Sequence, residues 1–125
     1  MSGQLGKLFI LLCDTPFQSE RVEHALKLAE TALDKGHEAS LFLFMDGVYN
    51  LLTTQKGEKF HVTPVSERLR GLMVKGAKIT CCGLCMELRG VEQSLIPEGI
   101  TPTGVSEIND EILEADAVLS FTGGT

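Results

Sequence analysis

The sequence predicts a single α/β domain over residues 1–125, with a mainly parallel sheet and helices on both of its faces. Two features of the chain indicate this fold. Short apolar runs of the kind found in buried strands alternate with amphipathic segments of helical period. The length of 125 residues suits one domain, and no linker, repeat or low-complexity stretch divides it. Strands that alternate with helices are joined by crossover connections and therefore lie parallel.

The first strand and the first helix follow directly from local patterns. Residues 7–13 (KLFILLC) form a short apolar run that ends at the turn Asp14-Thr15-Pro16. From Val22 onward, apolar residues recur at helical spacing and form one stripe of an amphipathic helix. Ser19 can cap the start of this helix, and Lys35-Gly36 closes its end.

The middle of the chain predicts two more strands and a second helix. A second apolar strand is expected at 38–45, followed by a short helix at 48–54 and a polar loop at 55–63. Pro64 to Gly76 has the start signal, apolar face and stop signal of a helix. Residues 77–81 (AKITC) then predict the third strand.

The last third of the chain is shorter in its elements and richer in turn residues. One or two helical turns are expected at 84–88, and 96–105 is predicted to be a loop with a short edge strand. Ser106 is predicted to cap a further helix, which leads to the last strand at 117–121.

Charge and apolar run lengths exclude several classes of protein. A formal net charge of −6 and an isoelectric point near 5.0, without a basic block, match a nucleic-acid binder poorly, so no direct nucleic-acid contact is expected. The longest apolar run, Leu8 to Cys13, has six residues, whereas a membrane-spanning helix needs about 20. The N-terminus lacks the features of a secretory signal, and the cysteine spacing is unlike a disulfide framework. We therefore expect a cytoplasmic protein with reduced thiols.

A Cys-x-x-Cys pair, Cys82 and Cys85, is the most informative motif. It comes just past the third predicted strand and at the start of a short helix. Functional groups in open parallel sheets gather outside the carboxyl ends of the strands. A cysteine at a helix N-terminus faces unpaired N–H groups, which favour the nucleophilic thiolate. The motif therefore predicts a reactive thiol at Cys82, with Cys85 one turn further along.

The other two cysteines have structural alternatives. If the strands at 7–13 and 77–81 are neighbours, as in a flavodoxin-like order, Cys13 lies near the Cys-x-x-Cys pair; otherwise it is a buried thiol at the end of an apolar strand. Cys81 shares strand parity with Ile79, so its side chain is expected to point into the core.

Metal and cofactor sites have weak support in the sequence. A structural zinc site needs four thiolate or imidazole ligands, and only one Cys-x-x-Cys is present, although Cys13 and His61 could complete a set. A dithiol redox role stays open, but thioredoxin-type motifs follow an early strand, and this chain has no Trp. No glycine-rich phosphate loop is present, so no nucleotide cofactor is expected.

Taken together, these motifs resemble the DsrE/DsrF-like family, which includes sulfur-relay proteins related to TusD. The resemblance rests on residues 44–48 (FMDGV) after the second strand, on Cys82 followed by Arg89-Gly90, and on an acidic helix at 107–116 before the last strand. It covers essentially the whole chain. It implies the three-layer sandwich of that family.

The resemblance also implies a sulfur carrier. On that interpretation Cys82 accepts sulfane sulfur as a persulfide from a donor and passes it to a partner protein, in sulfur oxidation or in tRNA thiolation. Cys85 would resolve the persulfide or protect Cys82 as a disulfide, and Cys13, Asp46 and Arg89 would be binding residues around the pair. Arg89 is alternatively a cation at a helix end that Gly90 stops.

Assembly and partners follow from the same resemblance. It implies donor and acceptor proteins as partners, and trimers or hexamers, built from one chain or mixed with related subunits. Two alternatives stay open: a non-catalytic assembly subunit of the same fold, and a redox or zinc Cys-x-x-Cys domain. A carrier of this kind is a possible sulfurtransferase without being a turnover enzyme.

Overall fold

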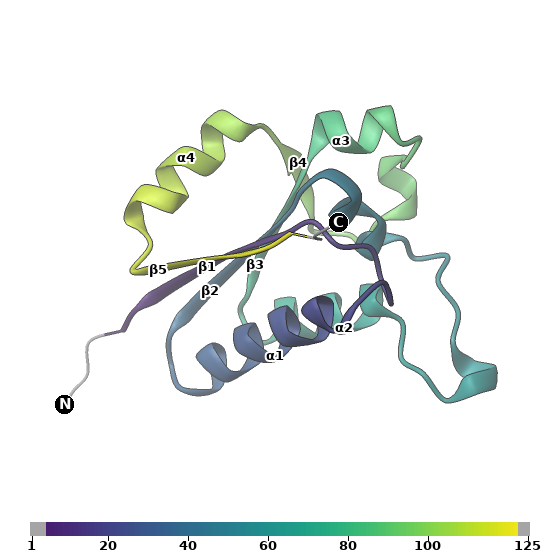
Figure 1. The fold of residues 1–125 in the computed structure, drawn as a ribbon, viewed down its shortest axis with the longest axis horizontal. Helices are drawn as coiled ribbons and strands as arrows, with labels where there is room; N and C mark the ends of the chain where they lie inside the picture. Colours follow the sequence, from purple (N-terminus) through teal and green to yellow (C-terminus); the bar gives the residue numbers. More distant parts are fainter. Residues whose placement is uncertain (1–4, 123–125) are drawn as a thin grey trace.

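A five-stranded parallel sheet lies between two layers of helices in the computed structural model, which describes residues 5–122 (Figure 1). The strands have the spatial order β4-β3-β2-β1-β5. Their bounds are β1 (Lys7–Leu12), β2 (Glu38–Leu43), β3 (Lys78–Cys82), β4 (Thr101–Thr103) and β5 (Ala117–Phe121). One face carries α1 (Glu20–Asp34) and α2 (Val65–Val74), and the other carries α3 (Gly83–Leu88) and α4 (Val105–Glu114). The predicted α/β class and the helices on both faces are confirmed.

The strand order differs from the flavodoxin-like order in one respect that matters for the cysteines. β2 lies between β1 and β3, with Leu12 paired to Leu43 and Leu43 paired to Cys81. The connections from β1 to β2 and from β2 to β3 each move the chain by one strand position in the same direction. β5 lies on the other side of β1. Neighbouring strands are about 4.8 Å apart, so the ends of β1 and β3 are separated by about 10 Å. Cys13 is therefore not on a strand next to the Cys-x-x-Cys pair.

The helix ends show which capping predictions hold. Ser19 caps α1 as predicted, because its side chain accepts a hydrogen bond from the Arg21 backbone N–H. Ser106 does not cap α4. The cap is Gly104, whose backbone N–H donates to the Glu107 carboxylate at 3.0 Å, so α4 begins two residues earlier than predicted.

The core lies on both sides of the central strands. Side chains of β3 alternate as predicted, so that Ile79 and Cys81 are both buried. The buried stripe of α1 is also the predicted one. The largest fully buried apolar side chains come mainly from β1 and β2; they include Phe9, Ile10, Leu12, Leu41, Phe42 and Leu43. This core fixes the carboxyl ends of β1, β2 and β3, where the chain leaves the sheet.

A 3₁₀ helix, η1 (Met45–Leu51), follows β2 and replaces the short helix predicted at 48–54. The predicted loop at 55–63 contains a further turn of 3₁₀ helix, η2 (Glu58–Phe60), which projects from the body of the protein (Figure 1). Within residues 5–122 no helix is both long enough and apolar enough to cross a membrane.

Gly47 lets η1 lie directly against the end of β1. A Cβ atom at this position would be 2.0 Å from the carbonyl oxygen of Leu12, far inside contact distance. Because the clash is with backbone, Gly47→Ala is expected to lower the free energy of unfolding by about 3 kcal/mol, measured by urea denaturation.

Gly71→Ala in α2 is the matched control for Gly47→Ala. No neighbouring atom of the described chain lies within 4 Å of a Cβ placed there, its own helix aside. Alanine favours a helix interior over glycine by roughly 0.5–1 kcal/mol, so this variant should be slightly more stable than wild type. Wild-type stability of Gly47→Ala would contradict the packing of η1 on β1.

Candidate functional site: paired thiols at the carboxyl edge of the sheet

Cys82 stands at the junction between a strand and a helix. It is the last residue of β3 and the N-cap of α3, and its Sγ accepts a hydrogen bond from the Cys85 backbone N–H at 3.2 Å. The side chain is buried, with 3% of the residue exposed. The sequence motif placed Cys82 at a helix N-terminus, and that placement is correct.

Cys85 lies one turn further along α3 and contacts the chain that leaves β2. Its Sγ accepts a hydrogen bond from the Met45 backbone N–H at 3.2 Å, and 4% of the residue is exposed. Met45 has a φ of 53°, in the left-handed region that residues other than glycine seldom occupy. The start of η1 therefore covers the second thiol of the pair.

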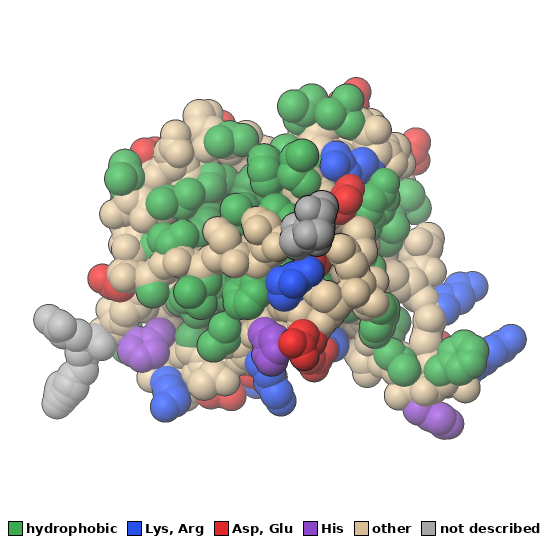
Figure 2. Space-filling view, in the orientation of Figure 1, with side chains coloured by type: hydrophobic (Ala, Val, Ile, Leu, Met, Phe, Trp, Pro, Cys, Tyr) green, Lys and Arg blue, Asp and Glu red, His purple; other side chains and the backbone are tan. Residues whose placement is uncertain are grey.

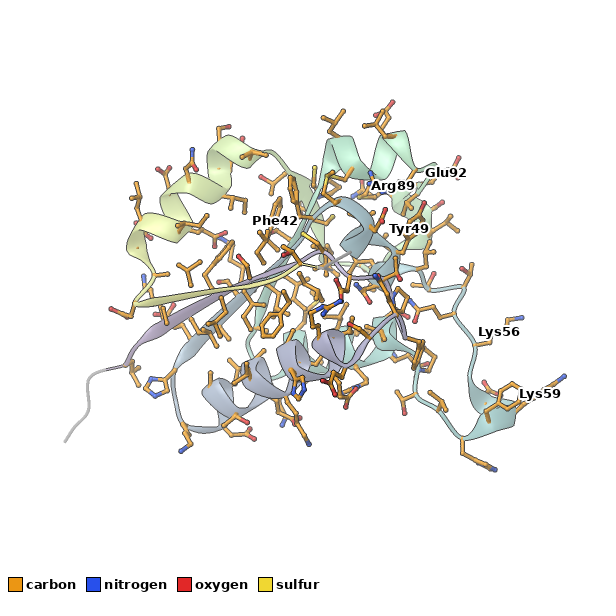
Figure 3. All side chains as sticks on the ribbon, viewed as in Figure 1. Phe42, Tyr49, Lys56, Lys59, Arg89 and Glu92 are labelled. Carbon is orange, nitrogen blue, oxygen red and sulfur yellow. The ribbon has the colours of Figure 1, made fainter. Side chains whose placement is uncertain are left out.

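Arg89 ties the end of α3 to the start of η1. Its Nε donates to Asp46 Oδ1 at 2.8 Å, and its Nη1 donates to the carbonyl oxygen of Cys85 at 3.3 Å. In Figure 3, Arg89 lies beside η1, which carries Tyr49. Arg89 is also the C-cap residue of α3, so the two interpretations of this residue are compatible.

Burial, hydrogen bonds and nearby charges shift the pKa values of the thiols in this region. Burial raises the pKa of the Cys85 thiol, and the hydrogen bond with Cys82 raises it further, whereas the Met45 N–H and the Arg89 guanidinium lower it. Burial raises the pKa of Cys81 to about 12. Cys81 also contacts the Met86 sulfur at 3.4 Å, so it is a core residue and a poor source of thiolate.

Cys13 flanks the site from the end of β1. It is half-buried, and its backbone N–H donates to the Phe121 carbonyl at 2.9 Å. Burial raises the pKa of its thiol, and the carboxylates of Asp14 and Asp46 raise it further. Of the five predicted site residues, the structure brings together Cys82, Cys85, Asp46 and Arg89 through direct contacts and leaves Cys13 at the margin.

Two buried polar residues that the sequence did not predict, Asp14 and Asn50, form hydrogen bonds that join the loops after β1 and β2. Asp14 is buried, and its Oδ2 accepts hydrogen bonds from Ser19 Oγ at 2.5 Å and Arg21 Nε at 2.7 Å. Asn50 is buried as well, and its side-chain amide donates to the carbonyls of Asp14 and Gly47 at 2.7 and 2.9 Å. The Asp-Thr-Pro turn was the only sequence signal at Asp14, and it gave no indication of a buried carboxylate.

The residues considered for zinc do not come together. Across residues 5–122, no three His, Cys, Asp or Glu side chains are grouped so that they could hold a metal ion. His61 follows η2 on the projecting loop and is exposed.

The fold and the site place this chain among small parallel α/β domains, with a thiol pair where β3 meets α3. The model of the DsrE/DsrF-like family matches residues 6–121, and the chain belongs to this family. The family includes sulfur-relay proteins, so the predicted resemblance is confirmed.

Relatives of known sequence and structure agree with this assignment. The chain is 30% identical over 113 residues to the uncharacterized protein MK0008 of Methanopyrus kandleri, covering 90% of this chain and 91% of that protein. It is 29% identical to the uncharacterized protein MJ0989 of Methanocaldococcus jannaschii, covering 92% and 99%. Among solved structures, the YchN protein of E. coli superposes with a TM-score of 0.84 at 25% identity, covering 94% of this chain and 100% of that one.

Proposed function

We propose that this protein is a sulfur carrier that accepts sulfane sulfur on Cys82 as a persulfide and passes it to a partner protein. The observation that carries the proposal is the position of Cys82, at the carboxyl end of β3, with the Cys85 N–H directed at its Sγ. Membership of a family that includes sulfur-relay proteins supports the same chemistry. The acceptor pathway would be sulfur oxidation or tRNA thiolation.

The loading step needs no cofactor. The Cys82 thiolate attacks the outer sulfur of a donor persulfide, a bond forms between Sγ and that sulfur, and the donor S–S bond breaks. The donor leaves as a thiolate with the electron pair, and the proton stays on the transferred sulfur. The protein would thus act as a sulfurtransferase in the sense of a carrier. Donor and acceptor proteins would be its partners in the cytoplasm.

Access to Cys82 requires local movement, because both thiols of the pair are almost fully buried. At Cys85 the cover is the start of η1, where the Met45 N–H donates to Cys85 Sγ and Asp46 pairs with Arg89. These are the parts of the site that must shift before a donor reaches the sulfur. Cys85, one turn away on α3, would then resolve the persulfide or protect Cys82 as a disulfide.

A trimer or hexamer, of this chain alone or with related subunits, is the proposed assembly. Apolar side chains remain exposed on both helices of the face that carries α3 and α4. They include Leu84 and Leu88 on α3, near the site, and Val105 on α4. Figure 2 shows hydrophobic side chains gathered across β5 and α4. A second candidate function, a non-catalytic assembly subunit with idle cysteines, is favoured by this surface together with the burial of the thiols.

The proposal is tested by the intact mass of the reduced protein after incubation with polysulfide, followed by peptide mapping. A gain of one sulfur on the peptide that contains Cys82 is the expected result. The absence of any adduct on the four cysteines, with the fold intact, would favour the assembly subunit instead.

A further inference from the structure

We propose that Arg89 recognises the sulfur donor through negative charge and that Asp46 is a built-in competitor for the same guanidinium. Besides a donor protein, the loading step then accepts a small anionic sulfane-sulfur compound, of which inorganic polysulfide is the simplest. It displaces the Asp46 carboxylate from Arg89 before it reaches the thiol pair. This inference rests on the proposed sulfur-carrier function and names its donor chemistry.

The first support is the geometry of the ion pair. A guanidinium has five N–H donors, and the contacts to Asp46 and to the Cys85 carbonyl use two of them. The Asp46 side chain is 58% exposed, whereas the Arg89 side chain is 20% exposed. Ion pairs with an exposed partner contribute little net stability, so a dianion can replace Asp46 at small cost. The guanidinium stays beside Cys85 when the carboxylate leaves.

The second support is the distribution of charge along the sheet edge. Asp14, which follows β1, and Asp46, which follows β2, both raise the pKa of the Cys13 thiol. The pKa of Cys85, after β3, is raised by burial, and the Arg89 guanidinium acts against this by favouring the thiolate. The chain as a whole carries a formal charge of −6, which repels anions. An anionic donor is therefore attracted locally toward the Cys82–Cys85 side of the opening.

The third support is the link between the ion pair and the cover over the thiols. Asp46 directly follows Met45, whose backbone N–H donates a hydrogen bond to Cys85 Sγ. While Asp46 stays on Arg89, the strained left-handed conformation of Met45 is held against α3. Displacement of the carboxylate by the donor releases this cover at the moment that the donor occupies Arg89. Recognition and access are thereby coupled.

The test compares disulfide reagents of different charge in a Cys13→Ser background, which removes the half-buried thiol outside the pair. Dithiobis(nitrobenzoate) is a dianion and dithiodipyridine is neutral. The readout is the ratio of the two rate constants. A variant that merely exposes the thiols speeds both reactions equally, so it leaves this ratio unchanged. Arg89→Gln should lower the ratio of dianionic to neutral rate about tenfold, and Asp46→Asn should raise it several-fold. Peptide mapping confirms reaction at Cys82 or Cys85.

Matched controls come from an ion pair on the other face of the sheet. Arg68 of α2 contacts Glu23 of α1 at 2.5 Å, and Arg68→Gln and Glu23→Gln repeat the same charge changes away from the thiols. Both should leave the ratio within about twofold of wild type. An unchanged ratio in Arg89→Gln, with normal persulfide formation from polysulfide, would overturn this inference alone. A shifted ratio without any persulfide would overturn the sulfur-carrier function and leave the anion site standing.

Discussion

Cys82→Ser is expected to abolish sulfur loading, with the adduct falling below about 1% of the wild-type yield. A serine hydroxyl without an adjacent general base does not ionise at neutral pH, so it cannot attack a sulfane sulfur. The fold should survive, because serine is a favourable N-cap residue and its Oγ can accept the Cys85 N–H in place of Sγ. The measurement is intact mass after polysulfide treatment, together with circular dichroism and the oligomeric state.

Two further variants, Cys13→Ser and Cys81→Ala, test whether the loss of sulfur loading is specific to Cys82. Cys13→Ser should keep most of the loading, because Cys13 is two strands away from Cys82 and its pKa is raised by burial and by two carboxylates. Cys81→Ala should also keep it, because that thiol is buried in the core. Loading that persists in Cys82→Ser and maps to Cys85 would contradict the assignment of the acceptor.

Much of the fold could be predicted because its signals are local. The amphipathic stripe of α1, its Ser19 cap and the alternation within β3 all depend on residues a few positions apart. The order of the strands could not be predicted in the same way. Periodicity identifies a strand but does not say which strand lies beside it, and here β2 separates β1 from β3. The start of α4 was missed because Glu107 caps it from inside the helix.

The candidate site, too, could be predicted from the sequence only where its signals are local. The Cys82–Cys85 pair and its place at a strand end follow from one short motif. The contacts that shape it join residues 40 and 43 positions apart, Met45 with Cys85 and Asp46 with Arg89. No local pattern encodes such contacts, since they exist only because β2 and β3 are neighbours. The near-complete burial of both thiols is therefore a finding of the structure.

Cys85→Ser is expected to lengthen the lifetime of the Cys82 persulfide at least about tenfold. In the wild type, the Cys85 thiolate attacks Cys82 Sγ, and the bond between Sγ and the outer sulfur breaks. Hydrosulfide leaves with the electron pair, so the sulfane sulfur is reduced while the two thiols are oxidised to a disulfide. No external oxidant is needed. Serine cannot perform this step, although its hydroxyl can still accept the Met45 N–H.

The same step gives a pH dependence whose sign is fixed by Cys85. Burial raises the pKa of that thiol, so at neutral pH its thiolate fraction is smaller than that of an ordinary cysteine. Hydrosulfide release should therefore rise by at most about tenfold per pH unit while the persulfide keeps the proton that leaves with hydrosulfide, and Cys85→Ser should remove the rise. A sulfide electrode measures the release, with Cys13→Ser as the control that keeps it. Equal release from Cys85→Ser and wild type would show that Cys85 does not resolve the persulfide, and the Cys-x-x-Cys pair would then contribute a hydrogen bond to Cys82 Sγ and no second thiol chemistry.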